Sequence, residues 1–197
     1  MPERYPGYDV LGKWNSPSFD AVTREVLARR LGAVPKRRFF TRGEWELLEA
    51  LGAHLIPQSK RADPIPITPW IDAMLADGGG EGFHRVGEPR DAEVWRTGLA
   101  AIDGEARRRH QARFIDLGPP MREALLRDLR AGAAGDGWSG VGPRRFLIDF
   151  LLKAMAAIYY SHPAAWSEIG FGGPASPRGY VRLQLGRRDP WEAGEAK

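Results

Sequence analysis

Apolar residues recur every three or four positions along most of the chain, which is the period of an α-helix. Glycine and proline interrupt this pattern and divide it into segments. The spacing predicts six main helices: Ser18 to Leu31, Thr41 to Ile56, Thr68 to Leu75, Arg90 to Arg109, Met121 to Leu129 and Pro143 to Ser161. Only residues 180–183 alternate weakly with the period of a strand. The pattern therefore predicts an all-α fold: an irregular bundle of about six helices followed by a loop-rich, aromatic C-terminal tail.

The strongest start signal belongs to the second of these helices. Thr41 at the N-cap and Glu44 three residues later form a capping box, and Phe40 and Trp45 have the spacing of a hydrophobic staple. Pro57 ends the run. This helix should begin directly after Thr41.

The helix that begins at Pro143 is apolar around nearly its whole circumference, and such a helix is buried on most sides. We expect it to be the hub of the bundle. Its apolar residues are Phe146, Leu147, Phe150, Leu151, Ala154, Met155, Ile158 and Tyr159.

The first predicted helix has Ser18 as its N-cap, and Phe19, Val22, Val26 and Leu27 form one apolar stripe along it. The composition then suggests three parts. Residues 1–39 form an N-terminal arm and a basic helix, residues 40–180 form a helical domain, and residues 181–197 form a C-terminal tail.

Positive charge is concentrated near the N-terminus. The segment from Arg24 to Arg42 holds seven basic residues and one acidic residue, whereas the whole chain of 197 residues carries a net charge of +4. A nucleic-acid interface would normally add stacking aromatics or a recognisable module, and only Phe39 and Phe40 lie nearby. We therefore expect a solvated face or a docking surface for an acidic partner, with no nucleic acid bound. Nucleic-acid binding through Arg24–Arg42 remains the alternative.

The composition also limits the location and the chemistry of the chain. It contains no cysteine, so disulfides, Fe–S clusters and thiol catalysis are excluded. The most apolar stretch, Phe146 to Tyr160, is too short for a membrane span and contains Asp149 and Lys153. No signal peptide is recognisable at the N-terminus, which favours a cytoplasmic protein.

Candidate catalytic groups are not arranged in any known pattern. The histidines His54, His84, His110 and His162 have no metal-ligand spacing, and Ser161 and His162 are adjacent without the context of a nucleophile elbow. The glycine run 78–80 follows no strand and precedes no Lys-Ser/Thr pair. We therefore predict no catalytic, cofactor-binding or metal-binding residue in this chain.

Aromatic residues are unusually dense in the C-terminal third. They are Tyr159, Tyr160, Trp166, Phe171, Tyr180 and Trp191. They either fill the core beneath the loop-rich tail or anchor an interface with another protein, since aromatic anchors are enriched at such contacts. The residue pattern leaves both interpretations open.

The run from Tyr159 through Pro163 and Trp166 to Gly172-Gly173-Pro174 resembles the aromatic–Pro–Trp–Gly–Gly–Pro signature of the gluconate 2-dehydrogenase subunit 3 family. The upstream segments around Leu55-Ile56-Pro57 and Trp95-x-x-Gly98-Leu99 are similar to other segments of that family. The resemblance covers roughly residues 40–180.

The resemblance implies a non-catalytic small (gamma) subunit. It would bind and stabilise, or assist the maturation of, a large flavoprotein of the glucose-methanol-choline (GMC) type that holds FAD and oxidises a sugar, a glycoside or a sugar acid. In this family a cytochrome c often takes the electrons. Members commonly carry an export signal, which residues 1–39 do not supply, so a periplasmic location would require co-export with the partner.

The resemblance also implies that one segment forms or supports the subunit interface. The predicted interface residues are Tyr159, Tyr160, His162, Pro163, Trp166, Phe171, Pro174 and Tyr180. The alternatives are a free-standing helical adaptor, the nucleic-acid binder described above and a helical enzyme whose site is assembled from distant residues.

Overall fold

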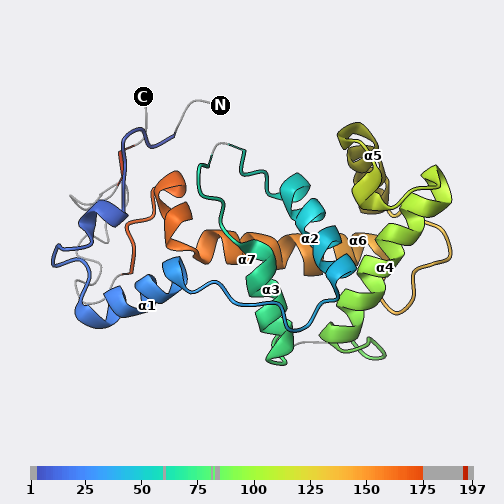
Figure 1. Cartoon of the computed structure of the whole chain (residues 1–197), viewed down its shortest axis with the longest axis horizontal. Coiled ribbons are helices and arrows are strands. Elements are labelled where there is room, and N and C mark those ends of the chain that lie inside the picture. Colours follow the sequence, from blue (N-terminus) through green and yellow to red (C-terminus); the bar gives the residue numbers. More distant parts are fainter. Residues whose placement is uncertain (1–3, 60, 81, 83–84, 175–192, 195–197) are drawn as a thin grey trace. The chain divides into compact units, whose positions relative to one another are not determined.

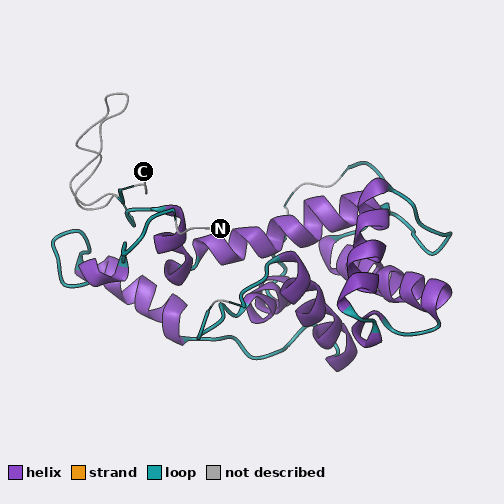
Figure 2. Cartoon of the chain, turned by 90° about the horizontal axis from the view of Figure 1, so that it is seen from above, coloured by secondary structure: helices purple, strands orange, loops and turns teal. Residues whose placement is uncertain are grey.

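The computed structural model describes residues 4–59, 61–80, 82, 85–174 and 193–194. These residues form helices, turns and loops and no strand, so the all-α prediction is confirmed for the part of the chain described (Figure 2). Figure 1 shows the order of the helices. They are α1 (Ala21–Gly32), α2 (Arg42–Leu55), α3 (Ile67–Ala76), α4 (Asp91–His110), α5 (Pro119–Ala131), α6 (Pro143–Arg145) and α7 (Lys153–Ser161).

Shorter helical pieces complete the fold. A π-helical segment, Phe146–Leu152, joins α6 to α7, so the predicted helix from Pro143 to Ser161 is one helical run with a widened middle. Three 3₁₀ turns lie at Leu11–Lys13, Phe114–Asp116 and Pro163–Ile169.

The contacts divide the chain into two compact units. The terminal unit combines Met1–Val34 with Tyr159–Lys197, and the central unit is Pro35–Ile158. The N-terminal arm and α1 therefore pack with the C-terminal segment, a grouping that the order of residues along the chain does not suggest.

The predicted hub lies at the centre of the central unit. Phe146, Phe150 and the other inward residues of the π-helical segment are buried, as is Met155 of α7. The ring of Trp95 in α4 meets Phe146 edge to face, with centroids 5.9 Å apart. Gly98, one turn after Trp95, allows this approach, because a Cβ there would collide with the Phe146 ring.

The start of α2 follows the prediction. The Thr41 side chain accepts from the Glu44 N–H (3.3 Å), and the Glu44 carboxylate accepts from the Thr41 N–H (2.7 Å), so the capping box is present. The helix ends at Leu55, two residues before Pro57.

Two other helix starts differ from the prediction. Helix α1 begins after Asp20, because its carboxylate accepts from the Thr23 N–H at 2.7 Å; the predicted cap, Ser18, lies outside the helix. Helix α3 begins at Ile67, so Thr68 is its buried second residue and not its cap. In both places the observed N-cap lies two residues from the predicted one.

Candidate partner-binding surface

The predicted interface residues lie in the terminal unit, around Trp166. This side chain is buried in a cluster with Val10, Phe19 and Leu27, against which Tyr8, Leu11 and Trp14 also pack. Its indole N–H donates to the Tyr160 carbonyl oxygen at 3.0 Å. Trp166 is therefore a core residue that holds the segment 160–171 in shape.

The N-terminal arm is hydrogen-bonded to this segment. The Val10 N–H donates to the Ser167 hydroxyl (3.1 Å), and the Tyr8 hydroxyl donates to the Phe171 carbonyl oxygen (3.2 Å). Gly170 has a φ of 68° and lies against the Tyr5 ring, where a Cβ would be too close. The arm and the C-terminal segment thus form one packed structure.

Burial separates the predicted interface residues into two groups. Tyr159, His162, Pro163 and Trp166 are buried, and the Tyr159 hydroxyl bonds to the Glu168 carboxylate at 2.7 Å. The exposed residues are Tyr160 (47% exposed) and Phe171 (41% exposed), while Pro174 is half-buried. Tyr180 lies outside the described residues. Within this group, only Tyr160 and Phe171 present large apolar area to a partner.

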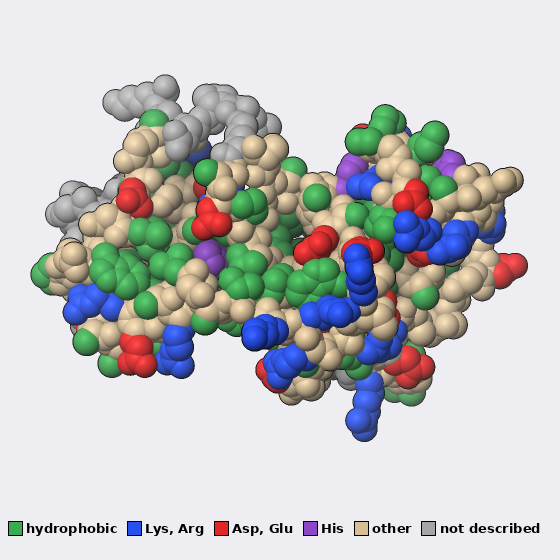
Figure 3. All heavy atoms as spheres, viewed as in Figure 1, with side chains coloured by type: hydrophobic (Ala, Val, Ile, Leu, Met, Phe, Trp, Pro, Cys, Tyr) green, Lys and Arg blue, Asp and Glu red, His purple; other side chains and the backbone are tan. Residues whose placement is uncertain are grey.

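Large exposed apolar side chains are concentrated in the terminal unit. Among the residues described, nine such side chains are exposed, and only Val86 and Met121 belong to the central unit. The other seven, which we call the terminal apolar surface, are Val22, Val26, Leu31, Val34, Tyr160, Ile169 and Phe171. Figure 3 shows hydrophobic side chains gathered over α1 and the C-terminal segment. Contiguous exposed apolar patches are typical of protein interaction sites, so the terminal unit is the candidate region for a partner.

Four members of this surface come from the first 34 residues and were not predicted as interface residues. The sequence pattern places Val22 and Val26 on the same stripe as Leu27, but the structure turns Leu27 to the core and leaves both valines exposed. Leu27 packs in the buried cluster with Val10, Phe19 and Trp166, and this packing turns the valines outward. A weak signal was available, since Val22 and Val26 are one turn apart whereas Leu27 is displaced around the helix.

His162 has a structural position at the start of the 3₁₀ turn 163–169. Its Nδ1 accepts from the Ala164 N–H at 3.3 Å and so caps the turn. The neighbouring Ser161 contributes its carbonyl oxygen to the Arg30 guanidinium at 3.2 Å. In the described ranges, no three side chains of His, Asp and Glu are grouped so that they could hold a metal ion.

A hollow of about 510 Å³ lies in the central unit, between the end of α2 and the start of α3. Its walls include Ile56, Pro57, Ile65 and Pro69. The only carboxylate among its lining residues, Glu49, accepts from the Trp45 indole N–H at 2.8 Å. The hollow is a mostly apolar depression, and its polar lining side chains are those of Glu49, Gln58, Ser59 and Thr68.

The arginines of the basic segment form ion pairs and hydrogen bonds with other groups of the same chain. Arg29 pairs with Glu25 (3.4 Å), Arg38 with Asp77 (2.8 Å) and Arg42 with Glu46 (2.8 Å). The hydrogen bonds from Arg38 hold the pKa of the Asp77 carboxyl below its usual value. Arg24, Arg30 and Arg37 donate to backbone carbonyl oxygens. Each arginine of this segment therefore has a partner within the chain.

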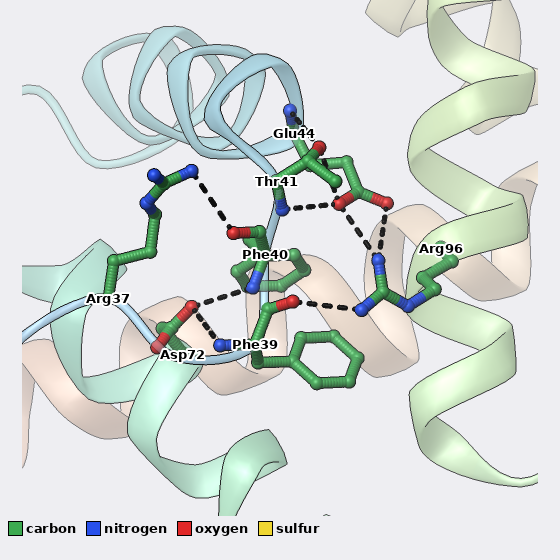
Figure 4. Close-up of polar contacts among 7 residues, drawn as sticks. All are labelled: Arg37, Phe39, Phe40, Thr41, Glu44, Asp72 and Arg96. Atoms are coloured by element: carbon green, nitrogen blue, oxygen red, sulfur yellow. Dashed lines mark hydrogen bonds and ion pairs between the residues drawn. The ribbon is translucent and has the colours of Figure 1, made fainter.

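Figure 4 shows how the connection into α2 is held. The Asp72 carboxylate is fully buried and accepts from the backbone N–H groups of Arg38 (2.6 Å), Phe39 (3.0 Å) and Phe40 (2.8 Å). Arg96 of α4 pairs with Glu44 at 3.0 Å and donates to the Phe39 carbonyl oxygen at 2.8 Å. Buried polar groups satisfied in this way stabilise a unique loop conformation. The network is structural and fixes the first turn of α2.

The comparison with known families agrees with the resemblance noted in the sequence. Residues 42–173 match the model of gluconate 2-dehydrogenase subunit 3. The chain belongs to this family. No curated protein and no solved structure matches it.

For this member of the gluconate 2-dehydrogenase subunit 3 family, the match runs from the first residue of α2 to Gly173. It includes the whole aromatic segment around Trp166, whereas α1 and the N-terminal arm lie outside it. Family membership implies a subunit of a dehydrogenase complex. No helix in the described part of the chain is long and apolar enough to cross a membrane.

Proposed function

We propose that this chain is the non-catalytic small subunit of an FAD-dependent dehydrogenase. It would bind a large GMC-type flavoprotein and stabilise it or assist its maturation, while the large subunit holds FAD and oxidises a sugar, a glycoside or a sugar acid. The observation that carries the proposal is the family match over residues 42–173. The terminal apolar surface supports it, because an accessory subunit needs an exposed surface for its partner.

Within the terminal unit, we assign the contact to the exposed residues Tyr160, Ile169 and Phe171. Tyrosine and phenylalanine contribute large, rigid apolar area, which is typical of the residues that dominate binding energy. The buried residues Trp166 and Tyr159 hold this segment from below. The Phe171 ring lies edge to face on Trp166, with centroids 5.2 Å apart, so its position is fixed before binding.

The test is to produce the large flavoprotein subunit of the same dehydrogenase with and without this chain. A higher soluble yield, more bound flavin and higher dehydrogenase activity in the presence of the chain support the proposal. Equal yield, flavin content and activity in both preparations contradict it. Salt-sensitive binding of DNA or RNA by the purified chain would support the nucleic-acid alternative instead.

A paired substitution tests the assigned surface. Tyr160→Ala combined with Phe171→Ala should leave the chain folded and weaken the complex by at least about tenfold, since central aromatic anchors commonly have effects of this size. Met121→Ala is the matched control, because this α5 side chain is 51% exposed and belongs to the central unit. Affinity measured by biolayer interferometry should be unchanged in the control.

The remaining parts of the assembly follow from the same proposal. The large subunit would transfer electrons to a cytochrome c, and the small subunit would reach the periplasm bound to its partner. Fractionation of cells that produce both subunits tests the second point. A chain that stays in the cytoplasm while its large subunit is exported contradicts co-export.

A further inference from the structure

Phe171, one of the residues that we assign to the partner contact, stands between glycines. Gly170 precedes it, Gly172 and Gly173 follow it, and both Gly170 (φ 68°) and Gly173 (φ 83°) have a left-handed backbone conformation. Glycine has more conformational freedom than any other residue, so a segment of this kind keeps one shape only where other groups hold it. The groups that hold this segment therefore decide how the Phe171 ring is presented.

The first 19 residues of the chain supply several of these groups. The Tyr5 ring lies against Gly170 and the Phe19 ring lies against Gly173, in each case where a Cβ on the glycine would be too close. Both aromatic residues precede Arg42, where the family match begins. The glycine-rich end of the matched segment is thus packed against a part of the chain that lies outside the match.

Tyr8 is the residue of the N-terminal arm that bonds to Phe171 itself. Its hydroxyl donates to the Phe171 carbonyl oxygen at 3.2 Å and accepts from the Lys13 ammonium at 2.8 Å. An ammonium group has only donors and a carbonyl oxygen only accepts, so the Tyr8 hydroxyl proton is directed to Phe171 and not to Lys13. The Lys13 ammonium also lies 4.8 Å from the centre of the Tyr8 ring, as a cation–π contact. Lys13 therefore helps to fix both the ring and the hydroxyl of Tyr8.

The remaining groups of Phe171 are held by Trp166. The two rings lie edge to face with centroids 5.2 Å apart, and the Phe171 N–H donates to the Trp166 carbonyl oxygen at 3.0 Å. Trp166 is buried, whereas Phe171 is 41% exposed. The ring and N–H of Phe171 are thus held from within the matched segment, and its carbonyl group is held by the arm.

We infer that Tyr8 is a positioning residue for the docking surface. Through its hydrogen bond to the Phe171 carbonyl oxygen, it holds the Phe171 ring in the orientation that the large flavoprotein subunit binds. The inference rests on the proposed function, in which Phe171 contacts that subunit. An anchor that is ordered before binding gives a tighter complex, because less conformational freedom is lost on association.

The first experiment compares Tyr8→Phe with Tyr5→Phe in the full chain. Tyr8→Phe removes the hydroxyl that bonds to Phe171 and keeps the ring. Tyr5→Phe is the matched control, because the Tyr5 hydroxyl makes no hydrogen bond with the described residues. Hydrogen–deuterium exchange in residues 167–172 should become about three- to tenfold faster in Tyr8→Phe, the factor that corresponds to one hydrogen bond, and stay the same in Tyr5→Phe. Exchange in α1 should not change in either variant, whereas a general loss of folding would also raise it there.

The second experiment measures the affinity of the same chains for the tagged large FAD subunit. Tyr8→Phe should weaken binding by about three- to tenfold, and Tyr5→Phe should bind like the unchanged chain. Lys13→Met should have a smaller effect in the same direction, because Tyr8 keeps its bond to Phe171 but loses the group that directs its hydroxyl. Circular dichroism and a thermal melt establish that each variant is folded, and Lys13→Met replaces Tyr8→Phe in both experiments if the latter is not.

The outcomes separate this inference from the proposed function. Faster exchange in residues 167–172 together with weaker binding, in Tyr8→Phe and not in Tyr5→Phe, supports the inference. If the unchanged chain does not bind the large subunit, the proposed function fails and the inference fails with it. If the unchanged chain binds and Tyr8→Phe changes neither the exchange nor the affinity, or only one of them, the inference alone is overturned. Equal losses of affinity in the two variants would also overturn it, because the effect would not belong to the Tyr8 hydroxyl.

Discussion

The two units of this chain differ in how many of their large apolar side chains are exposed. The large apolar residues of the central unit are buried or half-buried, and among the residues described only Val86 and Met121 are exposed. The much shorter terminal unit exposes seven. A small unit has too much surface for its volume to bury every apolar side chain, and the excess is available for a partner. The contrast separates a part that folds around its own core from a part suited to complex formation.

The polar groups of the two units differ in a similar way. In the central unit, the buried Asp72 carboxylate accepts three hydrogen bonds from the distant backbone of residues 38–40. The buried Glu105 carboxylate accepts from Arg108 and Arg109 on its own helix and from the distant Gly135 N–H. In the terminal unit, single hydrogen bonds such as Val10 to Ser167 and Arg30 to Ser161 join the N-terminal and C-terminal segments. We expect substitutions to affect folding more in the central unit and binding more in the terminal unit, with Trp166 as the exception.

Trp166→Ala should have the largest effect on stability. Removing a large aromatic side chain from a core typically costs about 3–5 kcal/mol, and here it also removes the hydrogen bond to the Tyr160 carbonyl. Urea unfolding followed by tryptophan fluorescence and circular dichroism measures the loss. The complex with the large subunit should weaken too, because Phe171 loses its support. If the variant keeps full stability and full affinity, Trp166 contributes neither to the core nor to the interface.

Gly98→Ala should destabilise the central unit by about 1–3 kcal/mol, the usual cost of overpacking. A Cβ at this position would collide with the Phe146 ring. Gly104→Ala on the same helix is the control, because nothing lies within 4 Å of a Cβ there. The control should gain about 0.5–1 kcal/mol, since alanine is the better helix former. Equal changes in the urea midpoint for the two variants would contradict this account of the α4 contact.

Glu105→Gln should destabilise the central unit by about 1–3 kcal/mol at neutral pH, because it weakens charge-assisted hydrogen bonds. Burial by itself raises the pKa of the Glu105 carboxyl, but hydrogen bonds from Arg108, the Gly135 N–H and Arg109 outweigh it and hold the pKa below its usual value.

The lowered pKa gives this prediction a pH dependence. The ionised carboxylate stabilises the fold at pH values above the usual glutamate pKa of about 4.3, and this contribution is lost as the pH falls through the lowered pKa. The unchanged chain and the Gln variant should therefore differ most at neutral pH and converge in strong acid. Urea unfolding at a series of pH values measures the free energy of unfolding of both chains. A difference that stays the same at every pH would contradict the assignment of this stability to the ionised Glu105 carboxylate.

Val22→Ala and Val26→Ala should have the smallest effect on stability and the opposite sign. Each should stabilise the isolated chain by a few tenths of a kcal/mol, up to about 0.5, because alanine is the better helix former and little packing is lost. Thermal unfolding measures this gain. Loss of stability similar to that of a core residue would show that the valines are packed inside the terminal unit and not available to a partner.

Much of the helical architecture could be predicted from local signals. The capping box at Thr41 and Glu44 depends on neighbours in sequence, so α2 begins where the pattern places it. The stripe around Trp95 and Leu99 likewise identified the buried face of α4. By contrast, Ser18 and Asp20 are both good caps, and only the burial of Phe19 outside the helix decided between them.

The exposed apolar residues of the terminal unit were predicted less completely. The aromatic segment 159–174 could be found because its composition is unusual and resembles a family signature. Within it, the sequence did not distinguish buried Trp166 from exposed Phe171, since both are aromatic residues of the same short segment. The exposure of Val22 and Val26 was missed, because the face that α1 buries depends on a core built from residues more than 130 positions apart.

The sequence by itself therefore determined the helical class, the strongest caps and membership in a family of dehydrogenase subunits, because these depend on local periodicity and on a contiguous signature. Only the tertiary structure decided that the N-terminal arm packs on the C-terminal segment, that Trp166 is interior, and that Val22 and Val26 face outward. Each of these depends on contacts between residues far apart in the chain, and burial, unlike helical periodicity, is a property of the assembled core.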